Sequence, residues 1–180
     1  MRKFFQLNIK LLTILLFTIM STKTVKASKS NFITLKTSKG SIIIKTLPKI
    51  APNHVKRIKE LVSSGFYNGI IFHRVIDGFM AQTGDPLGNG TGGSGKNLKA
   101  EFSDYKYKYG TVGMARSMNP DSGDSQFFIC FDGCGHLTGQ YTVWGQIETG
   151  MEVVEKIEIG EPPSNPDQII EAFVGKKKTK

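Results

Sequence analysis

A series of short apolar runs, each followed by glycine or polar residues, is the feature that most limits how this chain can fold. Two of these runs, residues 31–37 and 41–46, are rich in β-branched side chains and are separated only by Ser38-Lys39-Gly40. Together they predict a β-hairpin. Similar runs predict further short strands at residues 70–72, 75–76, 79–81, 111–115, 126–131, 141–147 and 168–174.

Only two segments have the spacing of apolar residues that is typical of a helix. The first opens at Asn53 and ends at Gly65, and the second follows Gly150. The apolar positions are Val55, Ile58, Leu61 and Val62 in the first segment and Met151, Val154 and Ile157 in the second. Many short strands with only two helices argue against alternating β-α-β units and predict an antiparallel barrel or sandwich. The long loop at residues 84–99 has no periodicity, and loops of this length are commonly functional or mobile.

The formal net charge of +9 is concentrated at the two ends of the chain. Residues 1–27 contain five basic residues and no acidic one, and the last five residues contain four lysines. The body between these ends is formally neutral, so the basic balance does not indicate a nucleic-acid partner. A chain of 180 residues is expected to form one domain.

The N-terminal segment has the pattern of a secretory signal. Basic residues precede an apolar run at residues 11–20, and Val25-Lys26-Ala27 supplies the small residues of a cleavage site. This run is too short for a spanning helix, which needs about 20 apolar residues. A buried N-terminal helix and an uncleaved anchor are the alternatives. We expect a signal peptide at residues 1–27, a folded domain at residues 28–175 and a basic tail at residues 176–180.

The expected location follows from this signal. Cleavage before Ser28 would leave an exported protein with no stable membrane span, and the periplasm is the predicted compartment. Secretion, or retention at the membrane by an uncleaved signal, are the alternatives.

The two cysteines, Cys130 and Cys134, enclose a Phe131-Asp132-Gly133 segment. Asp-Gly is a turn signal, and in an oxidising compartment such a pair can close a disulfide. Two free thiols fit the sequence equally well, because the sequence does not supply the Cβ geometry. A metal site with His136 would be one ligand short and unusually spaced, so no metal site is expected.

The glycine-rich loop contains two literal matches to nucleotide-binding motifs. Residues 88–93 match G-x-G-x-x-G, and residues 90–96 match G-x-x-x-x-G-K, with Asn97 where a P-loop has Ser or Thr. The first motif must be followed by a helix, and no helical pattern follows here; the second lacks its Ser or Thr. We therefore expect no nucleotide cofactor. The glycines instead indicate a surface loop with positive φ angles and close backbone approach.

The residues on their own supply no recognisable nucleophile and no strong acid–base pair. His54 stands at the start of the first predicted helix and is expected to be solvated. Alternating residues of a strand share a face, so Met80 and Gln82 are expected to point together. On pattern alone, residues 72–85 and 125–129 are also typical of an ordinary barrel core with polar residues at its surface.

Four segments, in this order, resemble the signature of the cyclophilin-type peptidyl-prolyl cis-trans isomerases. They are FHRVI at residues 72–76, GFMAQTGD at residues 78–85, GTGG at residues 90–93 and SQFFI at residues 125–129. The resemblance extends over residues 31–174, and it is strongest to the bacterial exported branch, through MARS at residues 114–117 and through Tyr141. It implies a mainly β fold, a closed eight-stranded antiparallel β-barrel capped by two α-helices.

The resemblance also implies roles for individual residues. Arg74 matches the catalytic arginine of the family, and Gln82 matches the residue that helps to hold the substrate backbone. The walls of the proline pocket are matched by Phe79, which we group with the catalytic residues, and by Met80, Phe128 and Leu137. Neighbouring peptide-binding positions are matched by Gly90, Ala115, Arg116, Ser117 and Gln126.

Three positions at the edge of this site depart from the best-known eukaryotic pattern. Arg116 replaces an Asn that contacts substrate largely through its backbone, so function is expected to survive. His136 replaces the Trp that favours cyclosporin, so cyclosporin binding is expected to be weakened. Tyr141 replaces a His at the pocket rim, where an aromatic hydroxyl keeps the shape and a donor.

The activity that the resemblance implies is rotation about X–Pro bonds, which crosses a barrier of ~18–20 kcal/mol. Arg74 would stabilise the twisted state, and no metal, nucleotide or redox cofactor is expected. The expected partners are proline-containing segments of unfolded or exported proteins, and we expect a monomer. The alternatives are a non-catalytic peptide-binding or chaperone module and an envelope-associated interaction protein that uses the basic tail.

Overall fold

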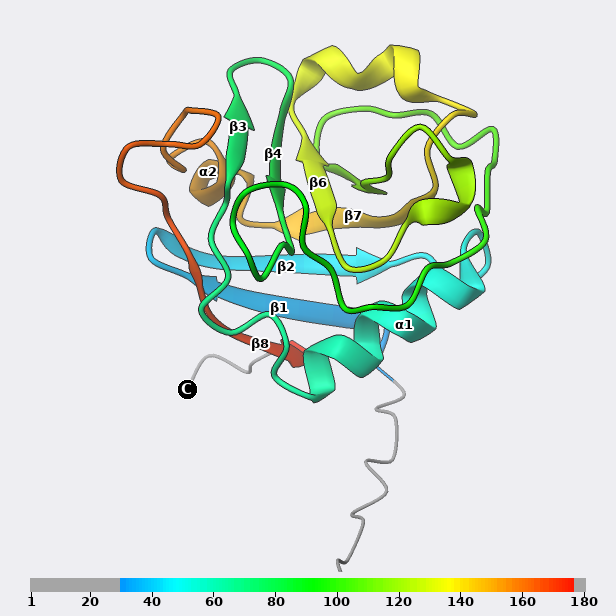
Figure 1. Ribbon diagram of the computed structural model, residues 1–180, viewed down its shortest axis with the longest axis horizontal. Helices are drawn as coiled ribbons and strands as arrows, with labels where there is room; N and C mark the ends of the chain where they lie inside the picture. Colours follow the sequence, from blue (N-terminus) through cyan, green and yellow to red (C-terminus); the bar gives the residue numbers. More distant parts are fainter. Residues whose placement is uncertain (1–29, 177–180) are drawn as a thin grey trace, which may run out of the picture.

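The computed structural model describes residues 30–176, so the predicted signal peptide and residues 177–180 of the predicted tail lie outside the described residues. Eight strands form one antiparallel sheet in the order β3-β4-β6-β5-β7-β2-β1-β8 (Figure 1). The strands are β1 (Phe32–Thr37), β2 (Gly40–Thr46), β3 (Arg74–Ile76), β4 (Met80–Thr83), β5 (Thr111–Met114), β6 (Phe127–Cys130), β7 (Val143–Thr149) and β8 (Ile169–Val174). The predicted hairpin is confirmed as β1 and β2.

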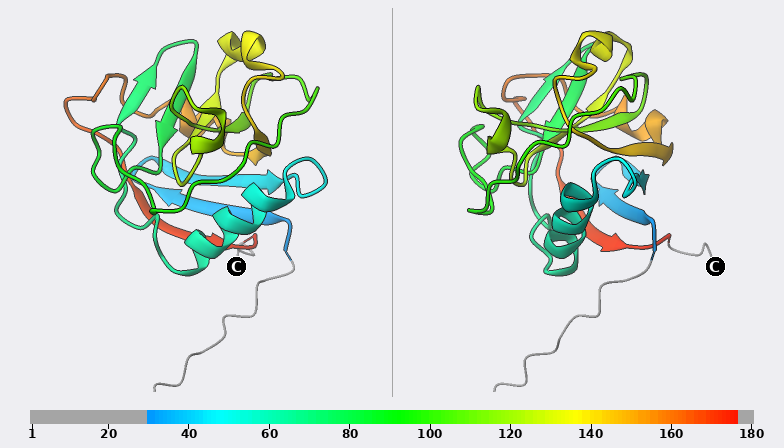
Figure 2. Two further views of the ribbon diagram at one scale, coloured as in Figure 1. Left: turned by 45° about the vertical axis from the view of Figure 1, so that its right-hand side comes forward. Right: turned by 90° about the vertical axis from the view of Figure 1, so that its right-hand side faces the viewer.

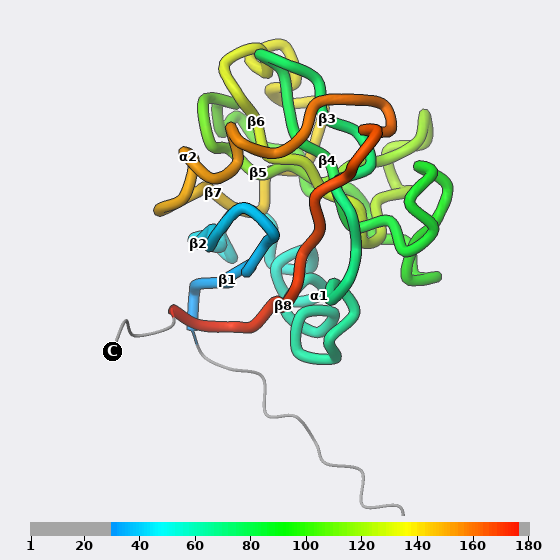
Figure 3. Tube along the Cα trace, turned by 90° about the vertical axis from the view of Figure 1, so that its left-hand side faces the viewer, coloured from blue at the N-terminus to red at the C-terminus, as the bar shows by residue number. Residues whose placement is uncertain are grey.

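The sheet curls until segments beside its two edge strands meet. Isolated antiparallel bridges join Ile71 to Gln168 and Val75 to Gly160, so β3 and the segment before it are linked by backbone hydrogen bonds to the segment that leads into β8. Figure 3 shows the red segment that leads into β8 running beside the green segment that leads into β3. The mainly β, eight-stranded antiparallel prediction is confirmed, and single bridges rather than a continuous ladder close this side.

Two α-helices lie where helical spacing predicted them. Helix α1 (Pro52–Ser63) packs against β7 and β8, and α2 (Met151–Val154) packs against β2 (Figure 2). Gly65 follows α1 with a φ of 76°, a conformation that glycine adopts at no steric cost. Helix α2 is shorter than the apolar spacing predicts, and Ile157 is buried just beyond its end. Two 3-10 helices, η1 (Pro120–Ser122) and η2 (Asp132–Leu137), flank β6. Among residues 30–176, no helix is both long and apolar enough to cross a membrane.

The interior contains two groups of buried side chains. The main core lies between α1 and the curled sheet and includes Leu35, Ile44, Ile58, Phe72, Phe127, Ile129 and Trp144. A smaller group, called here the pocket cluster, consists of Met80, Tyr107, Phe128, Cys130, Cys134, Leu137 and Val143. Because side chains alternate along a strand, β4 and β6 contribute to both groups. The pairs Met80–Cys130 and Gln82–Phe128 face the pocket cluster, whereas Ala81 and Ile129 face the main core.

Candidate active site

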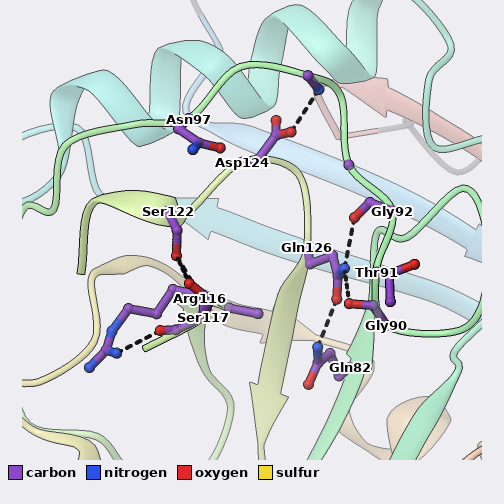
Figure 4. A pocket seen from close by; sticks show the side chains of 13 residues that line it. Gln82, Gly90, Thr91, Gly92, Asn97, Arg116, Ser117, Ser122, Asp124 and Gln126 are labelled. Atoms are coloured by element: carbon purple, nitrogen blue, oxygen red, sulfur yellow. Dashed lines mark hydrogen bonds between the residues drawn. The ribbon is translucent and has the colours of Figure 1, made fainter. Parts of the chain in front are cut away.

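A pocket of about 280 Å³, called here the apolar pocket after the side chains of its floor, lies over the pocket cluster. It is lined by Arg74, Phe79, Met80, Gln82, Ala115, Arg116, Phe128, His136, Leu137 and Tyr141. A second, more polar pocket of about 470 Å³ adjoins it and contains the remaining predicted residues, Gly90, Ser117 and Gln126 (Figure 4). Gln82, Ala115 and Arg116 line both pockets, so the structure brings all thirteen predicted site residues into one continuous site.

The apolar pocket is held in shape by ring contacts. Met80 and Phe128 are 2% and 4% exposed and form its floor. Phe128 stacks on Tyr107 and meets the Tyr141 ring edge-on, with centroid distances of 5.8 Å in both pairs. On the opposite wall, Phe79 stacks on His136 at 5.6 Å. Such pairs restrict side-chain movement, so the pocket has a defined apolar shape.

Arg74 lies at the edge of this pocket, on β3, directly opposite Gln82 of β4. Its Nε donates to Glu161 Oε2 at 2.6 Å, and its Nη1 lies 4.0 Å from the Sδ of Met80. One side of the guanidinium is therefore paired outside the pocket, and the other extends over the pocket floor. An arginine stays charged at any physiological pH and presents several donors in a planar fork.

The orientation of the Gln82 amide follows from its neighbour Gln126. The Nε2 of Gln126 donates to the carbonyl oxygens of Gly90 at 3.0 Å and Gly92 at 2.8 Å (Figure 4). Carbonyl oxygens only accept, so the Oε1 of Gln126 must face Gln82, whose Nε2 donates to it at 2.9 Å. The carbonyl oxygen of Gln82 and one of its N–H groups are left for a substrate.

The loop that supplies these carbonyls is organised by Asp85, which is 1% exposed. Its carboxylate accepts from the backbone N–H groups of Leu87 at 2.8 Å, Asn89 at 3.0 Å and Gly90. Burial raises the pKa of Asp85, but hydrogen bonds from the backbone of Leu87, Gly90, Gly92 and Asn89 outweigh it, and the pKa is lowered overall. A buried carboxylate thus fixes the loop and, through Gln126, the Gln82 amide.

Arg116 lines both pockets, and its guanidinium is paired with backbone carbonyl oxygens. Its Nη1 donates to the carbonyl oxygens of Ser117 at 2.9 Å and Met118 at 3.4 Å, and its Nη2 donates to that of Gln140 at 3.0 Å. The guanidinium carbon lies 4.3 Å from the centroid of the Tyr141 ring. Arg116 thereby ties two loops together at the rim.

The structure contains the disulfide between Cys130 and Cys134, one of the two states that the sequence left open. The Cα atoms are 6.0 Å apart, and both residues are fully buried. Cys130 ends β6, and Cys134 lies in η2 just before His136 and Leu137. The disulfide therefore fastens one wall of the apolar pocket to the strand that forms its floor.

The prediction that His54 is solvated was wrong. The residue is 1% exposed, and its Nδ1 lies 2.6 Å from Glu101 Oε2. Glu101 also accepts from the backbone N–H groups of Asn53 and His54, which have no partner within α1. Burial raises the pKa of Glu101, but the His54 side chain and these N–H groups lower it overall. The Glu101 carboxylate comes from a loop 47 residues away in the sequence, so no local pattern around His54 predicts the contact.

The protein-family model described as "Cyclophilin type peptidyl-prolyl cis-trans isomerase/CLD" matches residues 32–174 of this chain. A Brucella abortus protein named "Probable peptidyl-prolyl cis-trans isomerase" is 48% identical over 165 residues, covering 82% of this chain and 84% of that protein. A Helicobacter pylori "Peptidyl-prolyl cis-trans isomerase" is 44% identical over 138 residues, covering 74% of this chain and 84% of that protein.

Solved structures have the same fold. The crystal structure of a cyclophilin from Hirschia baltica matches with a TM-score of 0.74 at 29% identity, over 82% of this chain and 75% of that one. A cyclophilin-type isomerase from Cryptosporidium parvum, crystallised in the presence of the dipeptide Ala-Pro, matches with a TM-score of 0.75 at 28% identity. The match covers 81% of this chain and 99% of that one.

Proposed function

Because this chain belongs to the cyclophilin-type peptidyl-prolyl cis-trans isomerases, we propose that Arg74 accelerates rotation about X–Pro bonds by binding the twisted transition state. The activity itself, peptidyl-prolyl cis-trans isomerisation, is that of the family. The proposal concerns how this site performs it, on which proteins, and where.

Catalysis of this reaction needs no bond to break. The planar amide is stabilised by resonance, which rotation disrupts at a cost of ~18–20 kcal/mol. In the twisted state the proline nitrogen becomes pyramidal and regains a lone pair. A donor directed at that lone pair binds the twisted state more strongly than either planar state, which is the condition for catalysis.

The position of the Arg74 guanidinium is the observation that carries the proposal. Its Nη1 reaches over the floor of the apolar pocket, 4.0 Å from Met80 Sδ. A proline ring seated between Phe79, Phe128 and Leu137 would bring its nitrogen to that side of the pocket. The Cryptosporidium parvum structure was determined in the presence of Ala-Pro, so proline-containing peptides are the substrate class that we propose.

The neighbouring groups would hold the peptide on one side of the rotating bond. Gln82 presents its free carbonyl and N–H group beside Arg74, Ala115 and Arg116 border both pockets, and Ser117 borders the larger one. With the peptide held on one side of the X–Pro bond, only the other side rotates. Binding energy is thereby used to restrict the substrate to a reactive geometry.

Substitution Arg74→Ala tests this mechanism. We expect kcat/KM for a proline peptide to fall by about 10²–10³-fold, as for the loss of one preorganised donor in other enzymes. Thermal unfolding should change little, because the side chain is half-exposed. The measurement is protease-coupled isomerisation with the purified protein. An Arg74→Ala protein with undiminished activity would remove Arg74 from the mechanism.

We further propose that the isomerase acts on proline-containing segments of exported, unfolded proteins. The basic and apolar pattern of residues 1–27 supports export, and a disulfide at Cys130–Cys134 is suited to an oxidising compartment. Cell fractionation with N-terminal sequencing tests this. A mature protein that begins at Ser28 in the periplasmic fraction is expected, and a cytosolic protein that begins at Met1 would contradict it.

Two narrower proposals concern partners. We propose a monomer, which sedimentation or light scattering would test. We also propose weakened cyclosporin binding, because His136 and not Trp stacks on Phe79 at the pocket wall. Titration of His136→Trp against the unsubstituted protein should show tighter cyclosporin binding for the variant, and equal affinities would contradict the proposal.

A further inference from the structure

Glu161 occupies a position opposite the proposed catalytic arginine that nothing in the sequence motifs anticipates. We propose that Glu161 is a positioning residue for Arg74, which holds the guanidinium with its Nη side over the apolar pocket. This inference rests on the proposed role of Arg74 in isomerisation.

The backbone places the two residues face to face. The N–H of Val75 donates to the carbonyl of Gly160 at 2.8 Å, and the N–H of Gly160 donates back to Val75 at 2.9 Å. In an antiparallel bridge between residues 75 and 160, residues 74 and 161 are the next opposing pair. Arg74 and Glu161 are therefore cross-strand neighbours, although 87 residues separate them in the chain.

A tight turn that begins at Gly160 restricts where Glu161 can lie. Gly160 has a φ of 153°, and a Cβ at this position would lie 2.5 Å from the Cα of Pro163. A larger residue would displace the turn that carries Glu161. The bridge to Val75 and the tight turn together set the position of the Glu161 backbone opposite Arg74, independently of the ion pair itself.

The contact restricts the guanidinium in a specific way. Glu161 Oε2 accepts a hydrogen bond from Arg74 Nε at 2.6 Å. The Nε atom is the guanidinium nitrogen nearest the aliphatic part of the side chain, so Glu161 leaves both terminal nitrogens available. The Nη1 then lies 4.0 Å from Met80 Sδ. Two contacts on opposite sides define both the position and the plane of the group. Without Glu161, a long side chain that is 39% exposed would sample other rotamers.

Loss of Glu161 is expected to affect the reaction rate more than the stability of the fold. The Glu161 side chain is 51% exposed, and exposed ion pairs contribute little to folding. Misplacement of a catalytic group by about 1 Å, in contrast, can slow a reaction by up to about 10²-fold. Glu161 should therefore affect turnover and leave stability nearly unchanged.

The decisive experiment compares Glu161→Ala, Glu161→Gln and the control Glu158→Ala, which removes an exposed carboxylate from the same segment. For Glu161→Ala we expect kcat to fall by about three- to tenfold with KM and Tm little changed. Glu161→Gln keeps an acceptor oxygen for Nε–H and should restore most of the activity. Unchanged or raised kcat in Glu161→Ala would overturn the inference, and so would an equal loss in Glu158→Ala.

A double substitution establishes whether the effect passes through Arg74. In an Arg74→Ala background, Glu161→Ala should cause no further loss, because there is no guanidinium left to hold. The same proportional loss in both backgrounds would overturn the inference. In ¹⁵N-resolved NMR, the Arg74 Nε–H signal should be protected from exchange in the unsubstituted protein and in Glu161→Gln, and exposed in Glu161→Ala. An unprotected signal in the unsubstituted protein would also overturn it.

The two proposals fail separately in this design. Full activity of Arg74→Ala would reject the proposed mechanism, whatever Glu161 does. Loss of activity in Arg74→Ala together with full activity in Glu161→Ala would reject only the positioning role.

Discussion

Strands β4 and β6 present two faces that differ in how they are stabilised. On one face, Phe127 and Ile129 belong to the main core, where α1 and strands from both halves of the sheet pack on one another. On the other face, Phe128 and Cys130 belong to the pocket cluster, which has only seven buried members. The first face is stabilised mainly by apolar burial. The second depends on ring stacking, a disulfide and the amide chain that ends at Gln82.

This difference shows how the fold keeps an apolar pocket open. A large apolar cluster closes on itself because dispersion and burial favour dense packing. The smaller cluster is prevented from collapsing by contacts that have directions, namely hydrogen bonds and a covalent link. Substitutions on the two faces should therefore separate stability from activity.

The largest expected contrast is between two adjacent residues of β6. Phe127 is 1% exposed and meets Tyr67 and Trp144 edge-on, so Phe127→Ala should lower the free energy of unfolding by about 3–5 kcal/mol. Its kcat/KM per folded molecule should change little. Phe128→Ala should destabilise less and lower kcat/KM by about ten- to hundredfold, because the proline ring loses its floor. Urea unfolding measures the stability of the two variants, and the isomerisation assay measures their kcat/KM. Equal losses of kcat/KM in Phe127→Ala and Phe128→Ala would contradict the separate roles of the two faces.

A smaller effect on stability is expected at Gly113 of β5, which lies directly against the pocket floor. A Cβ at Gly113 of β5 would overlap the Tyr107 hydroxyl and lie 2.5 Å from Phe128 Cζ. Gly113→Ala should lower the free energy of unfolding by up to about 3 kcal/mol and also lower kcat/KM, because Phe128 must move. Gly135→Ala is a control, since nothing lies within 4 Å of its added Cβ. Unaltered activity in Gly113→Ala would show that the floor tolerates displacement.

Reduction of the disulfide should lower the free energy of unfolding by about 2 kcal/mol, as expected for a loop with a sequence separation of four. The loss should concentrate in the pocket cluster, because η2 carries His136 and Leu137. Hydrogen exchange with and without a reductant should show faster exchange in residues 132–137 and little change in α1. Uniformly faster exchange would show that the two faces unfold as one unit.

The smallest effect is expected for the carboxylate that organises the loop. The pKa of Asp85 is lowered in the folded protein, so its contribution to stability is present above the ordinary pKa of about 3.9 and is lost as pH falls below it. Asp85→Asn should cost about 1–2 kcal/mol at pH 7 and flatten the decline of stability below pH 4. Asp104→Asn, at an exposed position, is the control. An unchanged acid profile in Asp85→Asn would assign the decline to other groups.

Local patterns were sufficient for much of the fold. The hairpin β1–β2 and helix α1 follow from β-branched runs and from helical spacing, and they lie within one or two residues of their predicted bounds. The face shared by Met80 and Gln82 follows from alternation alone. These features depend on neighbours in sequence, which is what a pattern can report.

Contacts between distant segments were not predictable in this way. His54 was assigned to solvent because its partner, Glu101, comes from an irregular loop without periodicity. Glu161 reaches Arg74 because a single bridge joins β3 to the segment between α2 and β8, far away in the sequence. The sequence does not decide between a disulfide and two free thiols, because a Cys-x3-Cys spacing permits the disulfide but does not specify the backbone turn of η2.

The pairing of β1 with β8 has a practical consequence for handling the enzyme. The Gly175 N–H donates to the Phe32 carbonyl at 2.8 Å, so the first and last strands start and finish side by side. Figure 1 places this edge at the bottom of the molecule, whereas η2 and the tip of the β3–β4 hairpin lie at the top. A surface tether or a fused domain attached next to Phe32 or Gly175 would leave both pockets accessible. These two positions could also be joined by a short glycine linker, and new termini opened in an exposed loop, with the catalytic half undisturbed.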